Sequence, residues 1–128
     1  MNNTNKFPKP YPILHHCCIY TPYKKHGLMK LLEIIKEKAY KDISVVDIRL
    51  DEPTRFRVIF SDDEEWNIVN PYNHAIGRRW QEVWVDAPNV SYEILKTIIE
   101  PSLQTSLSNP IHFFNYEYLK ETDTDDNN

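Results

Sequence analysis

The side chains best suited to recognising a ligand gather in one loop, residues 70–80, which reads Asn-Pro-Tyr-Asn-His-Ala-Ile-Gly-Arg-Arg-Trp. Guanidinium groups bind planar anions through two parallel hydrogen bonds, and an indole ring offers a stacking face, so a nucleotide-like anion would suit this loop. The same residue types dominate protein interfaces. A third interpretation is a structural loop whose arginines pair with Asp51, Glu52 or Glu82. The candidate binding residues in the loop are Asn73, His74, Arg78, Arg79 and Trp80.

A second group with chemical potential is the run His15-His16-Cys17-Cys18. Imidazole and thiolate both bind zinc, but a tetrahedral site needs ligand pairs spaced a few residues apart, and neighbours on a strand point to opposite faces. A thiol beside an imidazole could also act as a nucleophile, although nothing around these residues matches a catalytic turn. We interpret the run as part of a buried strand and predict no metal, no cofactor and no catalytic residue.

The densest acidic cluster is Asp62-Asp63-Glu64-Glu65. Carboxylates bind calcium, but this cluster lacks the alternating ligand positions and the glycine of an EF-hand loop. We interpret it as a solvated turn between two strands. Its negative charge could still steer a basic partner toward the protein.

Composition limits the class of protein. The 128 residues fit one domain, and hydrophobic and charged fractions of 41% and 27% are ordinary for a folded chain. Two glycines argue against a glycine-rich phosphate loop, and a net charge of −4 disfavours binding to duplex nucleic acid. The chain shows neither a membrane-spanning apolar run nor a secretory signal pattern, and its two adjacent cysteines give no disulfide framework. We expect a cytoplasmic protein without membrane contact.

Alternating apolar and polar residues predict three or four consecutive antiparallel strands between residues 44 and 86. The runs 45–50 and 56–60 flank a four-residue turn that contains a proline, which is typical of a hairpin. Strands at 66–69 and 79–85 are expected to complete a meander.

The face of this sheet opposite the apolar core supplies further candidates for binding. The alternation places Arg55 and Arg57 on that face, beside either the tryptophans Trp80 and Trp84 or their valine neighbours. Exposed arginine and tryptophan side chains favour an interface. We therefore add Arg55, Arg57 and Trp84 to the candidate binding residues.

The remaining patterns predict two helices, one extra strand and two unstructured ends. Leu28, Leu31, Leu32, Ile35 and Ala39 share one face of a predicted amphipathic helix over residues 27–41. A shorter helix is expected over 91–100, and a strand over 13–20. The aromatic segment 111–119 must pack on the domain or face a partner. Domain 13–120 is expected to lie between a flexible arm, 1–12, and a disordered acidic tail, 121–128.

These patterns together predict an α+β fold, a two-layer structure in which a mostly antiparallel sheet of four to five strands packs against two helices. No motif indicates a reaction, so we expect a non-enzymatic interaction module, a small acidic protein that binds another protein and could inhibit it. A basic protein would suit its acidic surface. Size and composition would suit a phage or mobile-element accessory factor. The alternative is a binder of a nucleotide-like anion through the 70–80 loop, which could lie between subunits of a homo-oligomer.

Overall fold

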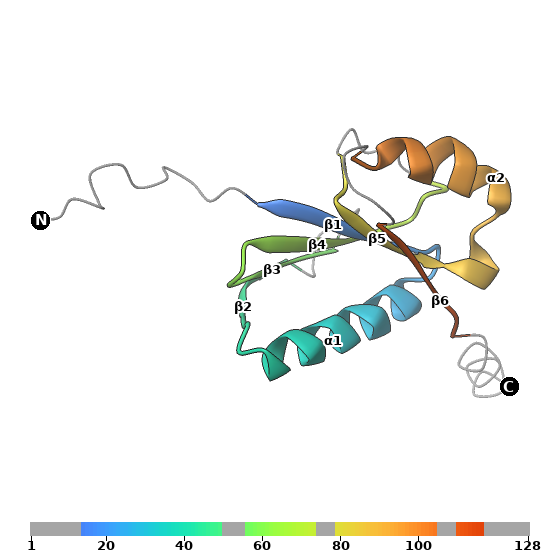
Figure 1. Cartoon of the computed structure of the whole chain (residues 1–128). Coiled ribbons are helices and arrows are strands. Elements are labelled where there is room, and N and C mark those ends of the chain that lie inside the picture. Colours follow the sequence, from blue (N-terminus) through green and yellow to red (C-terminus); the bar gives the residue numbers. More distant parts are fainter. Residues whose placement is uncertain (1–13, 50–55, 74–78, 105–109, 117–128) are drawn as a thin grey trace, which may run out of the picture.

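The computed structural model describes residues 14–49, 56–73, 79–104 and 110–116 (Figure 1). This part of the chain contains six strands and three helical segments, one of which is a short 3-10 turn over Ala87–Asn89. The strands are β1 (His15–Tyr20), β2 (Val45–Arg49), β3 (Phe56–Phe60), β4 (Glu64–Val69), β5 (Glu82–Asp86) and β6 (Ile111–Phe114). The first helix is α1 (Lys24–Tyr40), and the second, α2 (Tyr92–Ile94), continues as a π-helix over Leu95–Ile99 and a 3-10 turn over Glu100–Ser102. We call residues 92–102 the α2 segment.

The strands form one mixed sheet in the order β2-β3-β4-β1-β5-β6. β2, β3 and β4 are antiparallel neighbours, whereas β1 runs parallel to both β4 and β5, and β5 runs parallel to β6. The α+β class is confirmed, but the predicted four to five mostly antiparallel strands are wrong. β1 inserts between β4 and β5 because its last four residues are buried on both faces, which suits the centre of a sheet.

Helices cover the two faces of the sheet separately (Figure 1). Cys17 and Ile19 of β1 point into a core closed by α1, whereas Cys18 and Tyr20 point into a second core that contains Ile99 of the α2 segment. The prediction of a two-layer structure is therefore wrong. The alternation of buried residues along β1 gives both cores a share of the same strand.

The buried stripe of α1 differs from the predicted one. Its buried residues are His26, Gly27, Lys30, Leu31 and Ile34. Leu32, which the apolar spacing assigned to the core, is 59% exposed. A Cβ atom at Gly27 would lie 2.5 Å from Cγ2 of Ile68, so the missing side chain lets α1 approach β4 closely.

Several predictions fall on residues outside the described part of the chain. These are the arm 1–12, the turn 51–54 with Arg55, the loop residues His74 and Arg78, and the tail 121–128. Among the described residues, no helix is long and apolar enough to cross a membrane.

Candidate functional site

A row of three side chains crosses the centre of the sheet on the face covered by α1. Cys17 of β1 is in register with Trp66 of β4 on one side and with Glu82 of β5 on the other. A cavity of about 190 Å³ lies between this row and α1. We call it the tryptophan–glutamate pocket; its lining residues are Ile34, Glu37, Lys38, Lys41, Glu64, Trp66, Glu82 and Trp84.

Local periodicity explains why these residues share one pocket. Ile34 and Lys38 are four residues apart, so they lie along one side of α1, and Lys41 is the residue that caps the C-terminal end of this helix. In β4 and β5 the lining residues are two apart, and side chains two apart on a strand point to the same face. Each strand therefore contributes one glutamate and one tryptophan to the pocket.

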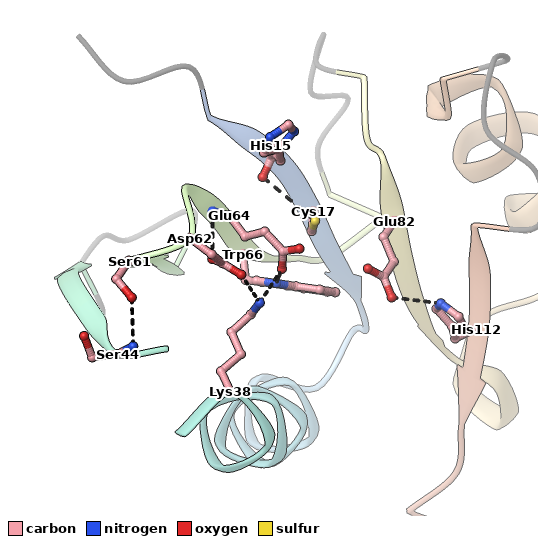
Figure 2. Close-up of polar contacts among 10 residues, drawn as sticks. All are labelled: His15, Cys17, Lys38, Ser44, Ser61, Asp62, Glu64, Trp66, Glu82 and His112. Carbon is pink, nitrogen blue, oxygen red and sulfur yellow. Dashed lines mark hydrogen bonds and ion pairs between the residues drawn. The ribbon is translucent and has the colours of Figure 1, made fainter. Parts of the chain in front are cut away.

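On one side of the pocket, Lys38 links α1 to two carboxylates of the sheet and its turn. Its Nζ atom lies 2.7 Å from Oδ2 of Asp62 and 2.8 Å from Oε1 of Glu64, and Figure 2 shows the side chain reaching from α1 toward both carboxylates. Trp66 Nε1 donates to the same Glu64 oxygen at 3.0 Å. Burial works against the charged forms, but the hydrogen bonds outweigh it, so the pKa of Lys38 is raised and the pKa of Asp62 is lowered.

The other side of the pocket is built on β5 and β6. Glu82 Oε2 lies 2.9 Å from Nε2 of His112, and Figure 2 shows these two side chains pointing toward one another. The His112 ring stacks on Trp84 with a centroid separation of 4.7 Å. Lys30 of α1 places its Nζ atom 3.5 Å from the centre of the Trp84 ring. This side therefore combines a carboxylate with an aromatic surface that already carries a cation.

The thiol of Cys17, which lies in the row between Trp66 and Glu82, is held in its protonated form. Cys17 is buried, and its burial, followed by the charges of Glu64 and Glu82, raises the pKa of the thiol far above its ordinary value. The opposing effect of Lys38 is smaller. Because a nucleophilic cysteine acts as a thiolate, the protonated Cys17 is unsuited to the nucleophilic role considered for it. The described residues contain no group of three or more His, Cys, Asp or Glu that could hold a metal ion.

Of the aromatic candidates, the structure places Trp84 in the pocket and Trp80 in the opposite core. Trp80 is 0% exposed and its Nε1 donates to the Tyr20 hydroxyl at 2.7 Å. Burial raises the pKa of Tyr20 to about 12, so this phenol stays neutral. Arg79 donates from Nη1 to the Leu103 backbone carbonyl at 3.3 Å, while Asn73 is exposed.

Arg57 belongs to a polar cluster on the sheet face opposite α1. Its Nη1 lies 3.4 Å from Oε2 of Glu65, whose Oε1 is 2.6 Å from Nδ1 of His16 and also accepts from Nδ2 of Asn67 at 3.3 Å. Glu65 and Asn67 are buried. The acidic cluster predicted as a solvated turn is thus divided, with Asp62 and Glu64 facing α1 and Glu65 buried on the other face.

Sequence reasoning missed a buried group where two parallel strands end. Asp86, the last residue of β5, accepts hydrogen bonds through Oδ2 from the Thr21 hydroxyl at 2.7 Å and from Nδ1 of His26 at 2.9 Å. Carboxyl ends of parallel strands are common ligand sites, but Asp86 and His26 are only 0% and 3% exposed. We interpret the group as a structural tie between α1 and the sheet. Only the parallel pairing of β1 with β5 could have revealed it.

Comparison with protein-family models, with curated proteins and with solved structures finds no match to this chain.

Proposed function

We propose that this protein is a non-enzymatic interaction module of the cytoplasm that binds another protein of basic character, and that the tryptophan–glutamate pocket receives a lysine or arginine side chain of that partner. The observation that carries the proposal is the lining of the pocket. It combines Trp66 and Trp84 with the carboxylates Glu37, Glu64 and Glu82 in one cavity.

The size of the pocket favours a single side chain over a whole cofactor or nucleotide. Pockets that bury small-molecule ligands typically enclose about 300–1,000 Å³. The cavity here is about 190 Å³. A long unbranched side chain inserted from a partner surface would fit such a volume, and pockets of this kind hold the anchor residues of protein interfaces.

Charge and aromatic surface favour a cation as the inserted group. Three glutamates and two lysines line the cavity, and one of these lysines, Lys38, is already paired with Asp62 and Glu64. An ammonium or guanidinium group gains from a tryptophan face and from a carboxylate acceptor. A phosphate group would instead be repelled by the negative charges of Glu64 and Glu82, which also disfavour the thiolate form of Cys17.

The alternative, a nucleotide-like ligand at the 70–80 loop, receives less support from the described residues. Its stacking face would come from Trp80, which is packed in the core. Its nearest described guanidinium, that of Arg79, is directed at a backbone carbonyl. We therefore propose that the function of this protein is to bind a basic protein partner.

A peptide screen tests this function directly. Capped peptides with random flanks and a central lysine, arginine, norleucine or glutamate are titrated into the protein while tryptophan fluorescence is recorded, because two of the three tryptophans line the pocket. We expect binding and a fluorescence change with lysine or arginine at the centre and none with norleucine or glutamate. Equal responses to all four central residues, or no response to any, would overturn the proposal.

A further inference from the structure

Strand β2 presents an open edge with two exposed apolar side chains. In the described part of the chain β2 pairs with β3 alone and ends the sheet. Val46 and Ile48 are 60% and 48% exposed. An edge strand with such side chains is a template for pairing with a further strand.

The backbone of Ile48 is directed toward this open edge. Its N–H donates to Oδ1 of Asp47 at 3.0 Å, whereas Ile48 lies opposite Val58 of β3 in the ladder. In an antiparallel pair, residues alternate between those that bond to the neighbouring strand and those whose N–H and C=O point away from it. Ile48 is of the second kind, and a carboxylate from its own strand occupies its outward donor.

The charges beside Ile48 are poorly matched within the sheet. Arg49 lies directly opposite Arg57 of β3, and like charges in that position repel. Asp47 lies opposite Ile59, which offers it no charge. The two side chains of β2 partly compensate each other, with 3.6 Å between Arg49 Nε and Asp47 Oδ2. Each has room for a partner of opposite charge on the open side.

We propose that two copies of this chain associate by antiparallel pairing of their β2 strands, with the two-fold axis at Ile48. In this register the Ile48 residues exchange N–H to C=O hydrogen bonds, and Asp47 of each copy lies opposite Arg49 of the other. Asp47 releases the Ile48 N–H and takes the second copy's Arg49 as its partner. The occupant of the open edge is thus a second copy, because the strand is complementary in charge to itself.

The neighbouring register does not share this complementarity. Centring the axis on Asp47 would place the two Asp47 carboxylates opposite each other, which is unfavourable. The register also shifts between Val45 and Asp47 on the β3 side, so Val46 is an extra residue in the ladder and limits the length of the paired edge. We therefore expect a specific but short interface and a dimer that dissociates on dilution.

A charge-swap experiment tests the pairing independently of the tryptophan–glutamate pocket. Sedimentation velocity over a concentration series should show a monomer–dimer equilibrium for the wild-type chain. D47R and R49D should each be monomeric, since each places like charges across the two-fold axis. Asp47 and Arg49 have half-exposed side chains in the monomer, so both variants should keep the wild-type circular dichroism spectrum.

Mixing the two variants gives the decisive result. In a mixed pair, the arginine introduced at position 47 faces the aspartate introduced at position 49, and the native Arg49 faces the native Asp47. We expect a heterodimer at concentrations at which neither variant dimerises alone. Three outcomes would each overturn the proposal: a monomeric wild type, single variants that dimerise like the wild type, or a mixture that stays monomeric. A monomeric wild type would mean that the open edge of β2 pairs with a strand of a different protein, if it pairs at all.

Discussion

The ammonium nitrogen of Lys30 lies 3.5 Å from the centre of the Trp84 ring, although Lys30 is a buried residue of α1. Its Nζ atom is also 3.0 Å from Oε1 of Glu33, and the other carboxylate oxygen of Glu33, Oε2, accepts a hydrogen bond from the Tyr116 hydroxyl. The protein thus holds one of its own cations on the aromatic surface beside the pocket. The proposed partner side chain would use the same chemistry in the adjoining space.

Replacing Lys30 with methionine should lower the free energy of unfolding by about 1 kcal/mol, because the variant keeps the apolar stem but loses the cation–aromatic contact and the ion pair with Glu33. Urea unfolding followed by circular dichroism measures the change. Lys36→Met is the matched control, since Lys36 is exposed on the same helix. Equal losses in the two variants would contradict the assigned contact.

The ion pair between Lys38 and Asp62 should stabilise the protein in a defined range of pH. Because the pKa of Asp62 is lowered, Asp62 contributes fully to the free energy of unfolding above the ordinary pKa value of 3.8. This contribution is lost as the pH falls through the lower pKa of the folded state. The raised pKa of Lys38 keeps its contribution intact up to 10.5, beyond which it is lost as the pH rises through the higher folded value.

Unfolding of the wild type and of Asp62→Asn, compared from neutral pH to below 3.8, measures the acidic limit of this range. The stability difference between the two proteins should be constant near neutrality and shrink toward zero in acid. A difference that grows in acid would show that Asp62 is not held in its charged form by Lys38.

Gly27→Ala should destabilise the fold although alanine favours a helix. The new Cβ would lie 2.5 Å from Cγ2 of Ile68 and 3.2 Å from Cγ2 of Thr21, and overpacking of this kind costs about 1–3 kcal/mol. Ile68→Leu removes the clashing methyl group. The double variant should therefore lose less stability than the sum of the two single changes, and strict additivity would contradict the close approach of α1 to β4.

Asp86→Ala should be among the most damaging single changes. It leaves the buried His26 and Thr21 without their shared acceptor, and breaking a buried pair of this kind costs about 3–5 kcal/mol. Glu93→Ala, at an exposed position of the α2 segment, is the control. Similar midpoints of urea unfolding for the two variants would contradict the role of Asp86 as a tie between α1 and the sheet.

The sequence predicts those parts of this fold that depend on local patterns. The β2–β3 hairpin follows from alternation around a turn, and α1 follows from helical spacing, so both were found within a few residues. The position of β1 between β4 and β5 is a non-local relationship that no local pattern reports. The meander predicted for the fourth strand was wrong for this reason.

The same distinction applies to the candidate site, because local patterns predicted some of its residues and missed others. Trp84 was nominated for its residue type, and Glu64 was one of the acidic residues expected to attract a basic partner; both line the pocket. Lys30 and Trp66 were missed because their burial depends on partners from distant strands and helices. A lysine on an amphipathic helix is predicted to be solvated unless the aromatic ring that covers it is known.

The tryptophan–glutamate pocket is proposed to bind a basic side chain of a partner. The affinity of the Glu82→Gln variant for a lysine-centred peptide from the screen decides whether it does. Calorimetric titration should show binding weakened about tenfold relative to the wild type, because a charged acceptor becomes neutral at nearly constant shape. Glu93→Gln, which makes the same change away from the pocket, should bind as the wild type does. Unchanged affinity in Glu82→Gln would contradict the claim.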